Sequence, residues 1–125
     1  PTRAGRTREA RVPRLIASDD AGIRLAAERI REGGVAAFPT ETVYGLGAGT
    51  LQPQALRRVY ELKGRPSDNP LIAHVVDAVE ARRLVQGWDR RCSRLAAAFW
   101  PGPLTLVLPK REVVPAIVTA VQVAV

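Results

Sequence analysis

Apolar and polar residues along this 125-residue chain follow two periods that alternate. Four segments show the three- and four-residue spacing of amphipathic helices, and they begin at Ser18, Pro53, Asp77 and Asp89. Ser18, Asp77 and Asp89 are side chains that cap helix N-termini, and Pro53 suits a first helical turn. Gly33–Gly34 and Gly64 are typical helix ends. The apolar face of the first helix is predicted to be Ile23, Ala26, Ala27 and Ile30; that of the second, Leu56, Val59 and Tyr60; and that of the fourth, Cys92, Leu95, Ala96 and Phe99.

Short apolar runs between these helices predict strands. They are VAAF (35–38), PLIAHVV (70–76) and LTLVLP (104–109). The run at 35–38 is predicted to be a short buried strand, and residues 40–48 continue it as a strand and a glycine-rich turn. The run at 70–76 is nearly continuous, which is typical of a strand covered on both faces. Further β-like sequence follows after 113. Helices interleaved with apolar strands predict an α/β domain.

Charge divides the chain into two parts. The net charge is +7, and residues 1–14 contain five arginines and one glutamate. We predict a flexible Arg-rich tail over 1–14 and a folded domain over 15–125. A nucleic-acid-binding arm is the alternative for the tail, but no aromatic residue there offers a stacking surface.

Localisation is predicted from what the sequence lacks. It has no apolar run of the roughly 18 residues that a membrane span needs, and its N-terminus has no apolar signal-peptide core. The single cysteine, Cys92, suits a reducing compartment. We therefore expect a cytoplasmic protein without a membrane partner.

The segment PTETVYGLGAGT (39–50) is a first candidate for chemistry. On a strand, Thr40 and Thr42 project to one side and Glu41 to the other. Glycines at 45, 47 and 49 permit close approach of a ligand to the backbone. The alternative is a plain turn built from small residues. The spacing is neither a dinucleotide-binding fingerprint nor a P-loop.

The segment KGRPSDNP (63–70) is a second candidate. Lys63 and Arg65 lie at the end of the second helix, where cations also offset the helix dipole. Arg65 lies past Gly64 and before Pro66, so its planar guanidinium is presented on a rigid turn that suits phosphate. Ser67 and Asn69 add neutral hydrogen-bonding groups. Chemically, this is a polyanion site.

His74 is the only histidine, within the apolar run 70–76. A lone histidine there is usually a satisfied core residue. One histidine and one cysteine make a zinc site implausible, and no GxSxG nucleophile motif is present. We expect catalysis by positioning and electrostatics rather than through a covalent intermediate.

Three blocks, FPTETVYGLGA (38–48), KGRPSDNPLIAHV (63–75) and WPGPLTLVL (100–108), resemble the YrdC family of threonylcarbamoyl-adenylate synthases. The resemblance implies a twisted mixed sheet with flanking helices around a basic cavity. It also implies a nucleotidyltransferase that makes threonylcarbamoyl-AMP and pyrophosphate from L-threonine, bicarbonate and ATP, with Mg²⁺. The product serves N6-threonylcarbamoyl modification of adenosine 37 in tRNA, through a downstream transfer machinery.

The resemblance also implies roles for individual residues. Lys63 and Arg65 would face the ATP phosphates as catalytic and nucleotide-binding residues, with Ser67, Asn69 and Thr105 as further nucleotide-binding positions. Thr40, Thr42 and His74 would hold L-threonine.

The family pattern continues with a strand ending in arginine and a Ser-x-Asn motif, which this sequence does not contain. We therefore expect residues 15–125 to be the N-terminal part of a longer domain, with weak ATP binding on their own. Two other functions remain open: a non-catalytic module for double-stranded RNA or tRNA, and a carbamoyl-transfer domain of a hydrogenase-maturation protein.

Overall fold

The computed structural model describes residues 12–66, 69–118 and 122–124, with side chains described up to residue 118. In order, the elements are α1 (Asp20–Arg31), β1 (Ala36–Phe38), β2 (Gly45–Gly47), α2 (Pro53–Lys63), α3 (Ala78–Leu84), α4 (Arg90–Phe99), β3 (Val107–Pro109) and β4 (Gln122–Ala124). This content confirms the α/β class. Most of the predicted tail, residues 1–11, lies outside the described residues.

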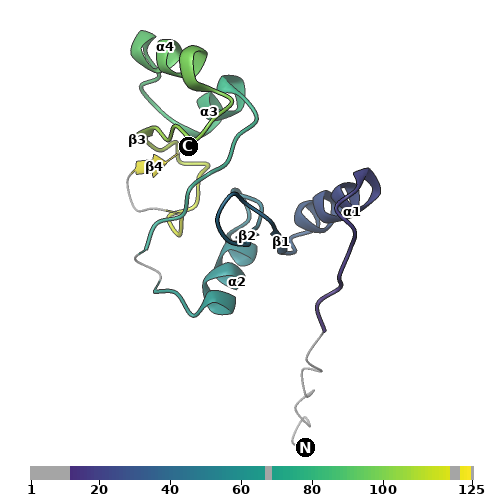
Figure 1. The fold of residues 1–125 in the computed structure, drawn as a ribbon. Coiled ribbons are helices and arrows are strands. Elements are labelled where there is room, and N and C mark those ends of the chain that lie inside the picture. Colours follow the sequence, from purple (N-terminus) through teal and green to yellow (C-terminus); the bar gives the residue numbers. More distant parts are fainter. Residues whose placement is uncertain (1–11, 67–68, 119–121, 125) are drawn as a thin grey trace, which may run out of the picture.

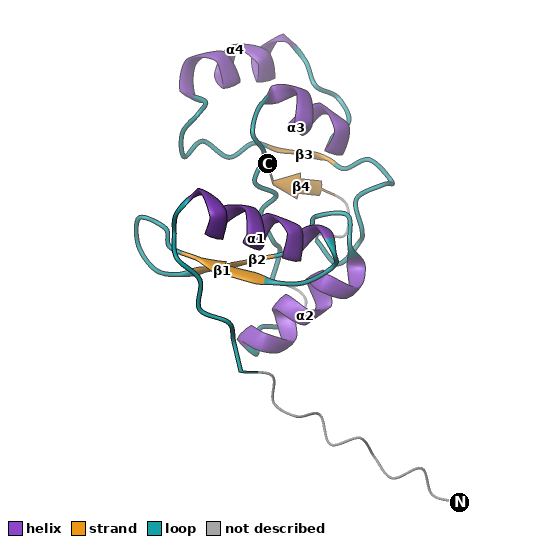
Figure 2. Cartoon of the chain, turned by 90° about the vertical axis from the view of Figure 1, so that its right-hand side faces the viewer, coloured by secondary structure: helices purple, strands orange, loops and turns teal. Residues whose placement is uncertain are grey.

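The described strands form two separate antiparallel pairs. Ala37 of β1 faces Leu46 of β2, and Leu108 of β3 faces Val123 of β4. The β1–β2 hairpin lies between α1 and α2, whereas α3 and α4 lie together near the β3–β4 pair (Figures 1 and 2). The single mixed sheet that the resemblance implied is therefore not seen among the described strands.

Local signals place the helix ends close to where they were predicted. Asp19, rather than Ser18, caps α1, and its carboxylate accepts from the Gly22 N–H at 2.8 Å. Gly64 ends α2 in the left-handed conformation, at φ 58°, which glycine adopts without steric cost. The predicted N-cap of α1 is thus wrong by one residue.

The caps of α3 and α4 are confirmed. Asp77 accepts from the Glu80 N–H at 2.9 Å, and Glu80 reaches back to accept from the Val76 N–H at 3.0 Å. This is close to a capping box, in which two otherwise unpaired N–H groups are satisfied. Asp89 accepts from the N–H groups of Arg91 and Cys92 at the start of α4.

The core joins segments that are far apart in sequence. Leu56 of α2 and Ala73 pack with residues of α3 and with the segment after β3. The fully or nearly buried cluster is Leu56, Ala73, Ala81, Leu84, Val85, Val114 and Val118. Its members come from α2, α3 and three segments outside the helices, and none comes from α1, so α1 contributes little to the packing energy.

The predicted strand at 70–76 is wrong in this structure. Leu71 donates to the Val118 carbonyl at 3.1 Å and Ile72 forms an isolated bridge, but no ladder follows. Ile72 and Val76 are 54% and 84% exposed, so the segment is not covered on both faces. A strand needs a continuous partner, and none pairs with this run among the described residues.

Two other predicted apolar faces are more exposed than expected. In α1 only Gly22 is buried, and Ile23 is 61% exposed, because β1 is the main neighbour of this helix. In α4, Cys92 and Ala96 are buried, whereas Phe99 is 58% exposed. The apolar face predicted for α2 is confirmed, with Leu56, Val59 and Tyr60 all buried.

Phe38 explains the glycines of β2. A Cβ atom on Gly47 would lie 2.7 Å from the Phe38 ring, and one on Gly45 would lie 3.0 Å from it. The prediction of a buried β1 is wrong, since Phe38 is 40% exposed. In this structure the glycines admit an aromatic ring, which is a packing role.

Tyr60 connects α2 to two distant backbone segments. Its hydroxyl lies 2.6 Å from the Asn69 carbonyl oxygen and 3.1 Å from that of Ile117, and the side chain is only 6% exposed. Two backbone carbonyl groups thus share the hydroxyl of one buried side chain. Buried polar groups without such partners carry a desolvation cost, so this contact holds three segments in register.

We predict that Tyr60→Phe lowers the free energy of unfolding by about 0.5–1.5 kcal/mol, the usual net value of a hydrogen bond, or somewhat more because two carbonyls lose a donor. Urea denaturation measures this change. Tyr44→Phe is the matched control, because Tyr44 is 75% exposed. Equal stability of the two variants would contradict the role given to the Tyr60 hydroxyl.

We also predict a pH dependence from Asp89. The Arg91 side chain and then the Cys92 N–H donate to this carboxylate, and they lower its pKa from 3.8 to about 2. A group with a lowered pKa stabilises the fold when ionised. Its contribution is therefore complete above pH 3.8 and is lost as the pH falls through about 2.

Calorimetric melting of the wild type and of Asp89→Asn, from neutral pH to pH 2, tests this. The wild type should be the more stable at neutral pH, and the difference should shrink below the ordinary carboxyl pKa. A difference that stays constant down to pH 2 would show that ionisation of Asp89 does not matter.

Candidate functional site

The Lys-Gly-Arg segment leaves α2 through a well-defined turn. Lys63 is the last residue of the helix and its side chain is exposed. The Gly64 N–H donates to the Glu61 carbonyl and the Arg65 N–H donates to the Tyr60 carbonyl at 3.1 Å. These bonds satisfy helix-end carbonyls and fix the direction in which Arg65 leaves the helix.

Arg65 is partly engaged with its own loop. Its Nη2 lies 3.3 Å from the Pro70 carbonyl oxygen, and the residue is half-buried. The Asn69 N–H donates to the Pro66 carbonyl, while the Asn69 carbonyl accepts from Tyr60. The loop is therefore anchored at both ends. Ser67, the remaining candidate in this segment, lies outside the described residues.

The predicted strand geometry of Thr40 and Thr42 is not observed. Residues 39–44 form a bend, in which the Thr40 hydroxyl donates to the Val43 carbonyl and accepts from the Thr42 N–H at 3.3 Å. Threonine hydroxyls often compete with ladder hydrogen bonds in this way. Both side chains are exposed, but the Thr40 hydroxyl is already used locally.

Thr105 lies two residues before β3 and is exposed. The turn that precedes it is held by Trp100, whose Nε1–H donates to the Leu104 carbonyl at 2.8 Å. Trp100 also contacts Trp88, with ring centroids 6.2 Å apart. The WPGPL segment is thus a turn held at its start by Trp100, and the exposed Thr105 follows it.

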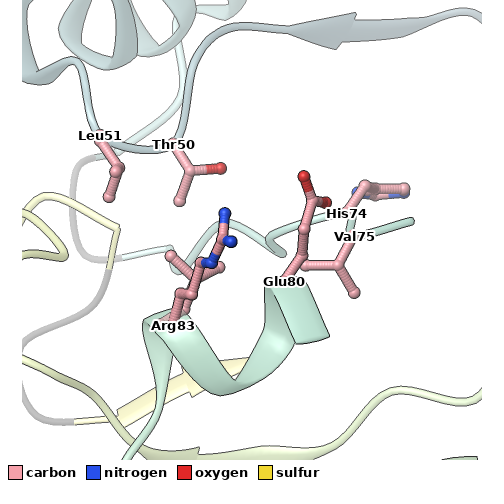
Figure 3. Close-up of a pocket in the computed structure, with 7 residues that line it drawn as sticks. Thr50, Leu51, His74, Val75, Glu80 and Arg83 are labelled. Atoms are coloured by element: carbon pink, nitrogen blue, oxygen red, sulfur yellow. The ribbon is translucent and has the colours of Figure 1, made fainter. Parts of the chain in front are cut away.

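His74 is not a core residue. It is exposed, with Nδ1 at 3.3 Å from the Ile72 carbonyl oxygen, and it borders a pocket of about 270 Å³ (Figure 3). The pocket is lined by Thr50, Leu51, His74, Val75, Glu80, Arg83 and Leu84. The structure therefore excludes the interpretation of His74 as a buried core residue. It does not bring the other predicted site residues into this pocket.

The sequence reasoning missed the polar groups that accompany His74. Figure 3 shows the Arg83 guanidinium, the Glu80 carboxylate and the Thr50 hydroxyl directed towards the same open space. In the sequence, Glu80 follows Asp77 by three residues, which indicates only a capping-box residue at the start of a helix. The available signal was the spacing of Glu80 and Arg83, since residues three apart share a helix face directly after the histidine segment.

Two features are absent from the described residues, a metal-binding cluster and a membrane-spanning helix. Residues 12–66, 69–118 and 122–124 contain no group of three or more histidine, cysteine, aspartate or glutamate side chains arranged to hold a metal ion. In the same part of the chain, no helix has the length and apolar character needed to cross a membrane.

Comparison with known proteins places the chain among its relatives. The model of the Sua5/YciO/YrdC family, described as "telomere recombination", matches residues 28–125. A threonylcarbamoyl-AMP synthase of Pyrococcus abyssi is 56% identical over 97 residues, which cover 78% of this chain and 28% of that protein. The Bacillus subtilis protein of the same name is 48% identical over 94 residues, covering 75% and 27% respectively.

A solved structure agrees with the sequence comparison. The structure of P. abyssi Sua5 complexed with L-threonine superposes with a TM-score of 0.80 at 50% identity, covering 90% of this chain and 33% of that one. The chain thus spans less than a third of the length of the two synthases it matches. The family match includes all of the 63–75 and 100–108 blocks and the 38–48 block that carried the resemblance. This chain belongs to the Sua5/YciO/YrdC family.

Proposed function

We propose that the protein is a threonylcarbamoyl-AMP synthase. The observation that carries this proposal is the 56% and 48% identity to two relatives with that name. The family match to residues 28–125 includes every candidate site segment. The reaction class is nucleotidyl transfer. L-threonine, bicarbonate and ATP would be the substrates, and threonylcarbamoyl-AMP and pyrophosphate the products.

The chemistry proceeds in two balanced steps. The amine of L-threonine and bicarbonate form a carbamate with loss of water. A carbamate oxygen then attacks the α-phosphorus of ATP, and the bond to the β,γ-diphosphate breaks, releasing pyrophosphate. The nucleophile is already anionic, so fixed positive charge near the phosphates is the main requirement.

Lys63 and Arg65 supply that charge in our proposal. They flank the left-handed Gly64 at the end of α2, and the loop that carries Arg65 is anchored through Tyr60. A preorganised guanidinium does not have to be ordered when substrate binds. Mg²⁺ would arrive with the ATP phosphates as part of the substrate. Asn69, Ser67 and Thr105 remain proposed nucleotide contacts.

L-threonine is the proposed amino-acid substrate. The solved relative complexed with L-threonine supports it, and His74, at the edge of an open pocket, is available for such a ligand. Thr40 and Thr42 remain proposed contacts. Thr42 lies on an exposed bend, and Thr40 would have to exchange its bond to Val43 for one to substrate.

The chemistry of the product indicates which other partners the protein would have. Threonylcarbamoyl-AMP is a reactive adenylate, so a transferase that places its threonylcarbamoyl group on adenosine 37 of tRNA would consume it. A cytoplasmic location and tRNA contact remain predictions. The alternatives of a non-catalytic RNA module and a carbamoyl-transfer domain are not favoured by the names of the relatives.

We predict that Lys63→Ala and Arg65→Ala in the full-length protein each reduce pyrophosphate release roughly ten- to a hundredfold, because hydrogen bonds to charged groups contribute about 1.5–3 kcal/mol. The assay contains L-threonine, bicarbonate and ATP, and each is omitted in turn. Arg57→Ala is the matched control, since Arg57 is an exposed cation of the same helix. Rates near wild type in both site variants would reject these two residues as the phosphate site.

We predict that His74→Ala raises the KM for L-threonine several-fold and leaves the KM for ATP within about twofold, as expected when one substrate loses a hydrogen bond. The ATP value serves as the internal control for folding. An equal rise in the KM for L-threonine and the KM for ATP would contradict this prediction, because it would mean that His74 supports the whole fold rather than the threonine site.

A further inference from the structure

The loop that leads from Arg65 to Pro70 contains a peptide unit with one hydrogen-bonding group fewer than usual. Proline has no N–H, so the peptide between Asn69 and Pro70 can be held only through the Asn69 carbonyl oxygen. That oxygen lies 2.6 Å from the Tyr60 hydroxyl, which donates to it. The Tyr60 hydroxyl therefore fixes the orientation of this peptide unit.

The same peptide unit sets the position of the Arg65 side chain. Arg65 Nη2 donates to the Pro70 carbonyl oxygen at 3.3 Å. Because the ring of Pro70 locks its φ, the Pro70 carbonyl follows the orientation of the peptide before it. One such bond occupies one of the five N–H donors of a guanidinium, and the other donors can still reach a phosphate. The Tyr60 hydroxyl is thus connected to the guanidinium through two adjacent carbonyl groups.

Both ends of the loop are attached to buried groups. At the start, the Arg65 N–H donates to the backbone carbonyl of Tyr60 at 3.1 Å, and Tyr60 is 6% exposed within α2. At the far end, the Tyr60 hydroxyl also lies 3.1 Å from the Ile117 carbonyl oxygen, and the Leu71 N–H donates to the carbonyl of the core residue Val118. The loop is therefore held between α2 and the core.

The two cations of this segment differ in what positions them. Lys63 is the last residue of α2, so the helix itself fixes its backbone. Arg65 lies beyond the left-handed Gly64, where the chain has left the helix. Loss of the Tyr60 hydroxyl would therefore release the Arg65 side chain and leave Lys63 in place.

We propose that Tyr60 is a positioning residue for Arg65 in the phosphate site, and that it acts through its hydroxyl and the peptide between Asn69 and Pro70. This role rests on the proposed function and adds to it a buried residue that acts through Arg65 rather than on the substrate. A guanidinium that is already held in place loses less conformational freedom when a triphosphate binds. The Tyr60 hydroxyl therefore contributes to ATP affinity as well as to stability.

A double-mutant cycle on ATP binding to the full-length protein tests this role without turnover. Calorimetric titration with Mg²⁺ and ATP is run on the wild type, on Tyr60→Phe, Lys63→Ala and Arg65→Ala, and on the double variants that combine Tyr60→Phe with each alanine. Tyr60→Phe should weaken ATP binding roughly two- to tenfold, the effect of one hydrogen bond. It should have little further effect in Arg65→Ala, and its full effect in Lys63→Ala.

A matched control separates positioning from a general loss of stability. Ser93→Ala also removes one side-chain hydrogen bond, the bond of 2.8 Å from Trp88 Nε1–H to the Ser93 hydroxyl. Ser93 belongs to α4, which lies apart from α2 (Figures 1 and 2). This variant should bind ATP as the wild type does, even where its melting temperature falls. All titrations are run at a temperature at which melting curves show every variant to be folded.

A second measurement decides the matter if Tyr60→Phe does not fold. Hydrogen exchange is then followed on the wild type with and without ATP. ATP should slow the exchange of the Leu71 N–H, because that group directly follows the peptide unit that the Tyr60 hydroxyl holds. Unchanged exchange at Leu71 would overturn the role of Tyr60.

The outcomes distinguish this role from the proposed function. Equal weakening by Tyr60→Phe in the wild type, in Arg65→Ala and in Lys63→Ala would overturn the positioning role, and so would unchanged ATP binding by Tyr60→Phe alone. If the wild type binds ATP but releases no pyrophosphate with L-threonine and bicarbonate, the synthase proposal falls and the cycle still decides the role of Tyr60. A wild type that does not bind ATP would overturn both.

Discussion

The hydroxyl of Tyr60 holds together the part of the structure on which the proposed chemistry depends. It bonds the Asn69 carbonyl at one end of the cationic loop, while the Tyr60 carbonyl accepts from the Arg65 N–H at the other end. The same residue thus closes the loop through its side chain and its backbone. Its second contact, to Ile117, ties that loop to the segment that completes the core.

The helix ends of this fold could be predicted because local contacts determine them. Strand pairing could not, because it joins segments that are far apart in sequence. A capping aspartate and a left-handed glycine act within one turn, so Asp77, Asp89 and Gly64 could be assigned from sequence. The 70–76 run had the composition of a covered strand, but composition does not specify which segment pairs with it. Among the described residues, Leu71 and Ile72 are the members of this run that make backbone contacts of that kind. Likewise, the apolar stripe of α1 was visible, whereas its exposure depends on which elements surround it.

The candidate site shows the same division. Lys63 and Arg65 could be proposed from sequence, because Arg65 lies between the helix-ending Gly64 and Pro66 and because both cations fall in a block that resembles the family. Glu80 and Arg83 could not, because a helix-capping glutamate and a helix-surface arginine each have an ordinary structural explanation. In the structure both side chains line the pocket beside His74, because α3 lies next to the turn at Thr50.

We propose that the protein joins an amino acid, bicarbonate and ATP into one adenylate. The most direct measurement is mass spectrometry of the nucleotide products formed by the full-length protein with L-threonine, ATP and ¹³C-labelled bicarbonate. We predict threonylcarbamoyl-AMP whose carbamoyl carbon carries the label, formed in equal amount with pyrophosphate. Formation of ADP and phosphate, or of AMP without a labelled threonine adduct, would contradict it.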